Sequence, residues 1–156
     1  MAMLKVGERA PSLDGETSTG APVSLEALRG KWVVVYFYPK ANTPGCTIET
    51  KRFLDGYDDI RALGAEVVGV SVDGLEDQCS FASDHQITFP LVADHTKAIS
   101  RAYGVLWPII GRDRRATFVV NPQGIIGAVF HFELRISQHL DQVLEFLRAQ
   151  RRELAR

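Results

Sequence analysis

Two largely apolar segments in the first half of the chain predict buried β-strands. Residues 32–38 read WVVVYFY and residues 66–72 read EVVGVSV. Residues 32–38 follow neither the two-residue period of a half-exposed strand nor the 3.6-residue period of a helix, and they are rich in β-branched and aromatic residues. This composition is typical of a strand that is buried on both faces. We therefore expect residues 32–38 to form a central strand and residues 66–72 to form a second buried strand.

Helical periodicity follows each of these strands. After the first strand, five apolar residues recur every three to five positions and predict one helix that ends at Gly64. They are Ile48, Phe53, Tyr57, Ile60 and Leu63. After the second strand, Asp73 and Glu76 have the spacing of a capping box and predict a helix that runs to about His85. Strand, loop and helix thus repeat twice.

The second half of the chain adds one strand, a hairpin and two helices. A short strand is expected at 88–92 and a short helix at 96–103. Residues 117–120 and 125–130 flank the turn sequence NPQG and predict an antiparallel hairpin. The last segment has the apolar spacing of an amphipathic helix, carried by Leu140, Val143, Leu144 and Leu147.

This order of elements predicts an α/β fold in a single domain that spans residues 1–156. The expected architecture is thioredoxin-like: a central mixed sheet, mostly parallel with an antiparallel edge, and helices on both faces. Residues 7–22 are rich in Gly, Ser, Thr and Pro, and we expect them to form an irregular arm or a small hairpin on the same domain.

Composition excludes several function classes. The chain is 46% hydrophobic and 24% charged, and its net charge of -1 provides no bulk field for binding nucleic acid or an anionic membrane. No apolar run approaches the roughly 18 residues of a membrane span. The chain has two cysteines and no apolar signal segment in residues 1–10, which favours a cytoplasmic protein whose cysteine chemistry is catalytic or redox-linked.

Cys46 is the strongest candidate for that chemistry. Thr43 is a favoured N-cap and Pro44 is favoured at the first helical position, so Cys46 falls at the third position of the predicted helix. Free N–H groups and the positive end of the helix dipole meet there, and both favour a thiolate. The alternative is that Cys46 is a small buried apolar residue.

Residues 36–49, YFYPKANTPGCTIE, closely resemble the active-site segment of the peroxiredoxins. The pattern of that family is Pro, three residues, Thr, two residues, Cys, and it is present here as Pro39, Thr43 and Cys46. The sequence of this segment is most similar to that of the bacterioferritin comigratory protein, or Q-type, subfamily. Further matching segments lie at 7–11, 89–94, 102–105 and 115–118. The resemblance therefore extends over nearly the whole chain.

The resemblance implies a thiol peroxidase that reduces hydrogen peroxide and organic hydroperoxides. Cys46 would attack the peroxide, and the Thr43 hydroxyl and the Cys46 backbone N–H would donate to the peroxide oxygens. Pro39 would shield the sulfur from water. The family's catalytic arginine corresponds to Arg115, with Arg114 as the alternative one position away.

Glu49 occupies a family position expected to orient its neighbours, although an exposed helix carboxylate is an alternative. The resemblance also raises the question of which thiol receives the oxidised Cys46. Many Q-type proteins carry a resolving cysteine where this chain has Lys51, so the internal candidate is Cys79. Cys79 is expected beside the apolar side of its helix, and the two helices would have to open locally before a 46–79 disulfide forms. The alternative is a one-Cys peroxidase in which Cys79 is half-buried and structural.

The remaining expectations concern partners. Thioredoxin or a glutaredoxin-like thiol would return the electrons, and the protein would be a monomer or a weak dimer. The histidines show no ligand spacing and no nucleotide motif is present, so neither a metal nor a cofactor is expected. The apolar segment 104–111 would line the peroxide entrance, form a self-association patch or pack as a lid. A rival from another class is a thioredoxin-fold binding or chaperone module without turnover.

Overall fold

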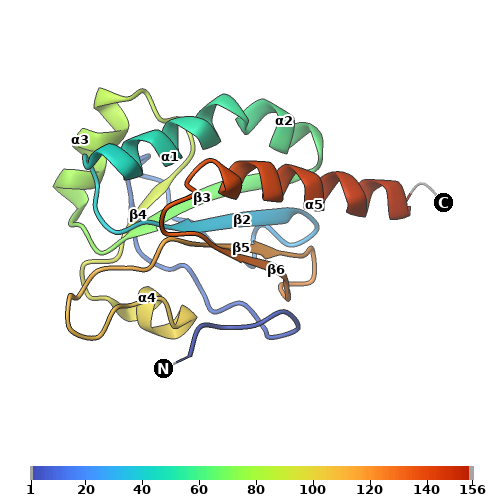
Figure 1. Cartoon of the computed structure of the whole chain (residues 1–156), viewed down its shortest axis with the longest axis horizontal. Coiled ribbons are helices and arrows are strands. Elements are labelled where there is room, and N and C mark those ends of the chain that lie inside the picture. Colours follow the sequence, from blue (N-terminus) through green and yellow to red (C-terminus); the bar gives the residue numbers. More distant parts are fainter. Residues whose placement is uncertain (1, 155–156) are drawn as a thin grey trace.

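A six-stranded mixed sheet forms the centre of the computed structural model, which describes residues 2–154 (Figure 1). The strands are β1 (Glu16–Thr17), β2 (Trp32–Phe37), β3 (Ala65–Ser71), β4 (Leu91–Ala93), β5 (Ala116–Val120) and β6 (Ile126–His131). Their order in the sheet is β1-β4-β3-β2-β5-β6. β2, β3 and β4 run parallel, and β1, β5 and β6 are antiparallel to their neighbours. The predicted mixed sheet and the antiparallel hairpin of β5 and β6 are confirmed. The expectation that the sheet is mostly parallel is wrong, because β1, β5 and β6 all pair antiparallel and only β2, β3 and β4 pair in parallel.

β2 is central and buried on both faces, as its composition predicted. Val34 and Tyr36 belong to the apolar cluster on one side of the sheet, and Val33, Val35 and Phe37 belong to the cluster on the other side. Each of these side chains is at most 1% exposed. The side chains of the unbroken apolar run therefore alternate between the two faces of the sheet, and each face is covered by its own layer of the protein.

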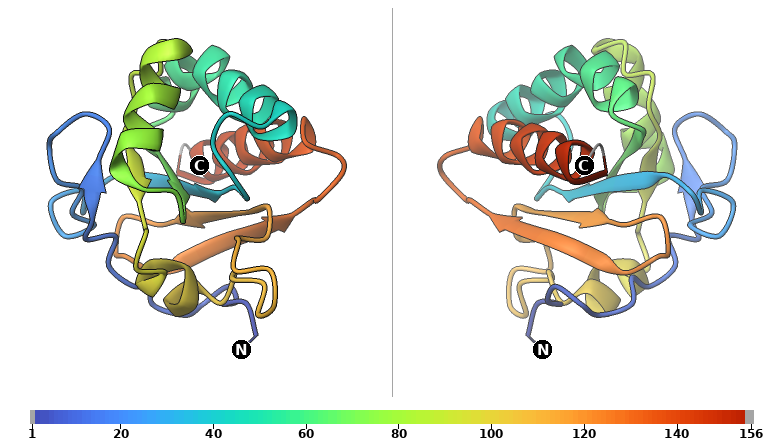
Figure 2. Two further views of the ribbon diagram at one scale, coloured as in Figure 1. Left: turned by 90° about the vertical axis from the view of Figure 1, so that its left-hand side faces the viewer. Right: turned by 90° about the vertical axis from the view of Figure 1, so that its right-hand side faces the viewer.

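Helices cover both faces of the sheet (Figures 1 and 2). The helices on one face are α1 (Pro44–Asp55), α2 (Tyr57–Ala62), α3 (Leu75–Asp84) and α5 (Gln138–Leu154). α4 (Ala98–Tyr103) and the N-terminal segment cover the other face, where Leu13, Val23 and Leu25 are buried. No helix in the described part of the chain is long and apolar enough to cross a membrane.

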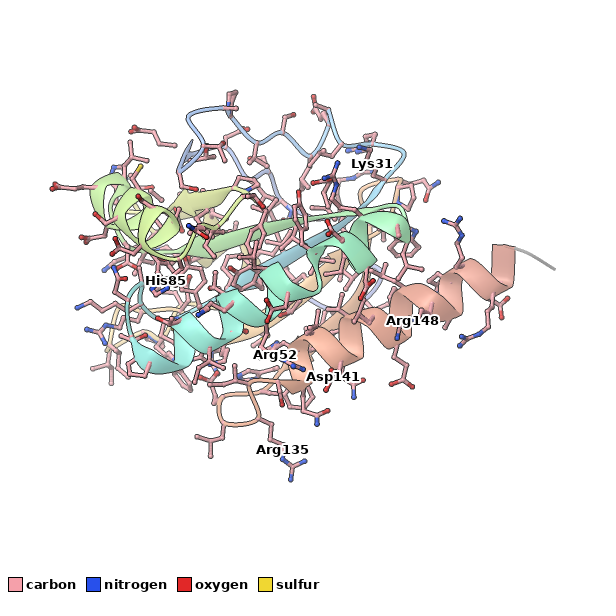
Figure 3. The ribbon with its side chains drawn as sticks, turned by 90° about the horizontal axis from the view of Figure 1, so that it is seen from above. Lys31, Arg52, His85, Arg135, Asp141 and Arg148 are labelled. Carbon is pink, nitrogen blue, oxygen red and sulfur yellow. The ribbon has the colours of Figure 1, made fainter. Side chains whose placement is uncertain are left out.

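The single helix predicted up to Gly64 is wrong, because the chain breaks at Gly56 into α1 and α2. A Cβ atom at Gly56 would lie 2.7 Å from a methyl carbon of Leu140, so α5 packs closely against the backbone at the break. An ion pair of 3.2 Å between Arg52 and Asp141 joins α1 to α5 beside this contact (Figure 3). The break lets both short helices follow the surface of α5.

Two other boundaries differ from the prediction. The capping box at Asp73 is wrong: α3 begins at Leu75 with Gly74 at the N-cap, and the Asp73 carboxylate instead accepts hydrogen bonds from the Ala41 N–H (2.7 Å) and the Ser71 hydroxyl (2.6 Å). The strand expected at 88–92 begins only at Leu91, because Pro90 has no N–H to donate to a sheet ladder.

Candidate active site

Cys46 lies in the first turn of α1, directly after the loop that leaves the carboxyl end of β2. Thr43 is the N-cap, and the first bond of the helix runs from the Thr47 N–H to the Thr43 carbonyl at 2.9 Å. Cys46 is fully buried. The Thr43 hydroxyl does not cap the helix but donates to the Lys40 carbonyl at 2.7 Å. Cys46 thus holds the third helical position, at the positive end of α1, as the N-cap signal predicted.

The register of the sheet brings Arg115 to this thiol. Phe37 at the end of β2 pairs with Ala116 at the start of antiparallel β5. Arg115, the residue before β5, therefore lies beside the loop that leads from β2 into α1 and Cys46. Arg115 Nη1 donates to Cys46 Sγ at 3.5 Å. Arg114 instead lies over the ring of Trp107, with its guanidinium carbon 3.9 Å from the ring centroid. The structure therefore places Arg115, and not Arg114, against the sulfur.

Gly45 leaves room for the guanidinium. A Cβ atom there would lie 3.3 Å from Arg115 Nη2 and 3.2 Å from a methyl carbon of Ile136. Gly45 does not have a positive φ angle, so close approach rather than backbone conformation requires the absence of a side chain.

Glu49 is buried, which corrects the alternative of an exposed helix carboxylate. It is 1% exposed, one turn after Cys46, and its Oε1 accepts a hydrogen bond of 2.8 Å from Arg115 Nη1. Burial raises the pKa of Glu49 to about 8, an effect that Arg115 opposes and Glu133 reinforces. Glu133 also accepts the backbone N–H of Arg115 at 2.8 Å. The two carboxyl groups together fix the position of the arginine.

His139 is a buried residue of the site that the sequence analysis missed. Its Nδ1 lies 2.8 Å from the Thr117 hydroxyl, and its Nε2 lies 3.0 Å from the Phe132 carbonyl and 3.7 Å from Glu49 Oε2. Burial lowers the pKa of His139 to about 4, so the ring is neutral. The signal in the sequence is that His139 precedes Val143 by four residues and thus shares the core-facing side of its helix.

Cys79 is exposed, so the expected position beside the apolar side of the helix and the alternative of a half-buried Cys79 are both wrong. The inward position next to it is taken by Gln78, whose amide N–H groups donate to the Ser71 hydroxyl (3.0 Å) and the Val92 carbonyl (2.8 Å). Gln78 also accepts a hydrogen bond from the Tyr38 hydroxyl. These partners decide which side of α3 faces the sheet, and they leave the Cys79 thiol in solvent.

The other predicted features lie around the site. Pro39 is half-buried in the loop after β2, where the bond from Ala41 to Asp73 holds the backbone. In segment 104–111, Ile109 is 98% and Ile110 is 66% exposed, so these two side chains do not pack as a lid. Among residues 2–154, no three His, Cys, Asp or Glu side chains are grouped so that they could hold a metal ion.

The comparisons with known proteins agree with this geometry. The family model described as the AhpC/TSA family matches residues 6–129. The chloroplastic peroxiredoxin Q of Sedum lineare is 34% identical over 95% of this chain and 80% of its own length. The crystal structure of peroxidoxin BcpB from Mycobacterium tuberculosis superposes with a TM-score of 0.87, at 31% identity, over 94% of this chain and 97% of that chain.

A second solved structure is the bacterioferritin comigratory protein of Xanthomonas campestris, whose description names alkyl peroxide reduction. It has a TM-score of 0.81 and 30% identity, and the match covers 96% of this chain and 98% of that chain. These likenesses confirm the thioredoxin-like fold of the peroxiredoxins. The chain belongs to the AhpC/TSA family, and within it this thiol peroxidase is a peroxiredoxin of the Q, or bacterioferritin comigratory protein, subfamily.

Proposed function

We propose that Cys46 reduces hydrogen peroxide and organic hydroperoxides and is itself oxidised to a sulfenic acid. The observation that carries the proposal is the contact between Arg115 Nη1 and the buried Cys46 Sγ, 3.5 Å apart, at the first turn of α1. A guanidinium and a helix N-terminus both favour the thiolate, which is the nucleophile that the reaction needs.

The other residues of the motif have roles in this step. The thiolate sulfur attacks one peroxide oxygen, and the second oxygen leaves with a growing negative charge. Arg115 and the Cys46 backbone N–H are donors for that charge. The hydrogen of the Thr43 hydroxyl goes to the Lys40 carbonyl, so the Thr43 oxygen presents its lone pairs to the peroxide O–H. Thr43 then orients the peroxide as an acceptor, in place of the donor role that the resemblance implies, and the half-buried Pro39 limits the access of water.

Cys79 is the proposed resolving residue. Its thiol is exposed on α3 and can condense with the Cys46 sulfenic acid to give a disulfide and water. The two cysteines lie in different helices, so α1 or α3 must open locally. Opening of α3 breaks the bonds of Gln78 to Tyr38, Ser71 and Val92.

A thioredoxin or glutaredoxin-like thiol then reduces the disulfide, in the cytoplasm, with the protein as a monomer or weak dimer. A mass measurement after one equivalent of peroxide tests the cycle. The expected product of the wild type has lost two hydrogens, and Cys79→Ser gives a sulfenic acid that a trapping reagent captures. Ser80→Ala, an exposed neighbour on α3, serves as the control and behaves as the wild type.

Cys46→Ser is expected to consume no peroxide. Consumption by this variant would refute the role of Cys46, and no consumption by the wild type would favour a binding module. If Cys79→Ser turns over with a dithiol at the wild-type rate, the protein is a one-Cys peroxidase and Cys79 has no resolving role.

A further inference from the structure

Two acidic side chains share one cation in the buried site. Cys46 Sγ and Glu49 Oε1 both accept hydrogen bonds from Arg115 Nη1, at 3.5 and 2.8 Å. The exposed fractions of Cys46, Glu49 and Arg115 are 0%, 1% and 7%. If both acids were ionised, two negative charges would face one positive charge with little water to screen them, which is costly. One proton held between the two acids restores the balance of one negative and one positive charge.

His139 does not stabilise the ionised form of Glu49. Because a carbonyl oxygen can only accept, the proton on His139 Nε2 is directed to the Phe132 carbonyl at 3.0 Å, not to Glu49 Oε2 at 3.7 Å. The Thr117 hydroxyl is the partner of the other ring nitrogen, at 2.8 Å. Among the described residues, Glu49 Oε2 therefore has no hydrogen-bond donor, although it is buried. The ionised form of Glu49 therefore lacks one of the hydrogen bonds that would stabilise it.

The other ionisable groups around Glu49 act in the same direction or are neutral. Glu133, after β6, is negative and raises the pKa of Glu49, and His131 pairs with Glu133 at 2.7 Å. Tyr36 on β2 is buried and its pKa is raised well above the usual value, so it stays neutral. Among residues 2–154, Arg115 is the cation that opposes these effects. With the pKa of Glu49 at about 8, the carboxyl group holds its proton at neutral pH.

We propose that Glu49 is the proton reserve of the peroxide reaction: it holds a proton while Cys46 is a thiolate and releases it when Cys46 becomes a sulfenic acid. This proposal rests on the proposed function. His139 is a positioning residue, because its bonds to Phe132 and Thr117 withhold a donor from Glu49 Oε2.

The proton and electron balance is complete. The Cys46 sulfur bonds to the terminal oxygen of the hydroperoxide, the O–O bond breaks, and its electron pair leaves on the second oxygen as an alkoxide. Sulfur is oxidised by two electrons and the peroxide is reduced by two. The terminal oxygen keeps its hydrogen and gives the sulfenic acid, and the alkoxide takes up one proton. Glu49 releases one proton, and its carboxylate replaces the thiolate as the single anion on Arg115.

Proton uptake from solution tests the proposal. Cys79→Ser protein in weak buffer receives one equivalent of hydrogen peroxide, and a pH indicator reports the protons consumed for each sulfenic acid. A thiolate without an internal reserve takes one proton from solution. We expect almost none at neutral pH, and a rise toward one as the pH passes about 8, where Glu49 has already ionised in the reduced protein. When Glu49→Gln is combined with Cys79→Ser, the protein should take up one proton from solution at neutral pH. Glu76→Gln, at an exposed carboxyl group on α3, should leave the proton uptake unchanged.

An un-ionised Cys46 thiol beside an ionised Glu49 would also consume no proton, so two spectra locate the proton. The ultraviolet absorbance of the reduced protein is expected to show a thiolate at the same pH. The infrared difference spectrum of oxidation is expected to show the loss of a protonated carboxyl band that Glu49→Gln lacks. Uptake of one proton at neutral pH, a missing thiolate or a missing carboxyl band in the Cys79→Ser protein overturns the proposal, and none of these results requires Glu49→Gln to fold. Failure to consume peroxide overturns the proposed function instead.

Discussion

Replacement of Asp113 by asparagine should stabilise the protein, and increasingly so as the pH rises. Asp113 precedes Arg115 by two residues and is fully buried. Its Oδ2 lies 3.0 Å from the Ser100 hydroxyl, which lies 2.7 Å from Asp94 Oδ2. Asp94 already accepts the backbone N–H groups of Ile99 and Ser100. A serine hydroxyl has one hydrogen, and if it goes to Asp94, Asp113 must donate to Ser100 and therefore carries a proton.

The size of the effect follows from linkage. Burial and the nearby carboxylates Asp94 and Asp73 raise the pKa of Asp113 to about 8, whereas the unfolded value is near 3.8. Between these two values the folded state binds more protons than the unfolded state, so the free energy of unfolding falls as the pH rises and is lower by a constant amount above about pH 8. The difference of about four in pKa corresponds to at most about 6 kcal/mol.

Asparagine has nearly the same shape, keeps a donor for Ser100 and has no charge to bury. Urea unfolding under reducing conditions, followed at several pH values, should show Asp113→Asn matching the wild type near pH 4 and exceeding it by about 2 kcal/mol or more near pH 9. Asp84→Asn, at an exposed carboxylate on α3, is the matched control and should follow the wild type throughout. Parallel stability curves for Asp113→Asn and the wild type would show that Asp113 is not a protonated acid.

Three further predictions concern the site and the packing around it. Arg115→Ala should lower the rate constant for peroxide consumption by about 10²- to 10³-fold, and Arg114→Ala by far less; the reverse order in a stopped-flow assay would contradict the placement of Arg115 on the thiol. Gly56→Ala should lower the free energy of unfolding by about 1–3 kcal/mol in urea titrations, because its methyl group meets α5; unchanged stability would mean that α5 shifts freely. Gln78→Leu should speed disulfide formation after one equivalent of peroxide, measured by quenching and mass analysis; an unchanged rate would show that α3 is not the element that opens.

Sequence reasoning succeeded where the signal is local. The composition of β2 predicts burial on both faces, and the turn at 121–124 predicts the hairpin of β5 and β6. The third helical position of Cys46 follows from the Thr43-Pro44 cap signal alone. In each case, neighbours within a few positions decide the conformation.

It failed where a distant segment decides. Arg114 and Arg115 cannot be separated until the pairing of Phe37 with Ala116 shows which of them meets the thiol. The break at Gly56 depends on α5, and the orientation of α3 depends on the partners of Gln78 on β3 and β4. These contacts join residues far apart in the chain, so no local pattern encodes them.

The contact between Gly45 and Arg115 has a consequence for how the motif tolerates change. Because a Cβ atom at position 45 would lie only 3.3 Å from Arg115 Nη2, we expect positions 45 and 115 to be energetically coupled rather than independent. A methyl group at position 45 should harm a protein that has the arginine more than one in which alanine has replaced it, where the contact with Ile136 remains. The glycine before the thiol therefore belongs to the arginine's binding site, although it is separated from it by 70 positions along the chain.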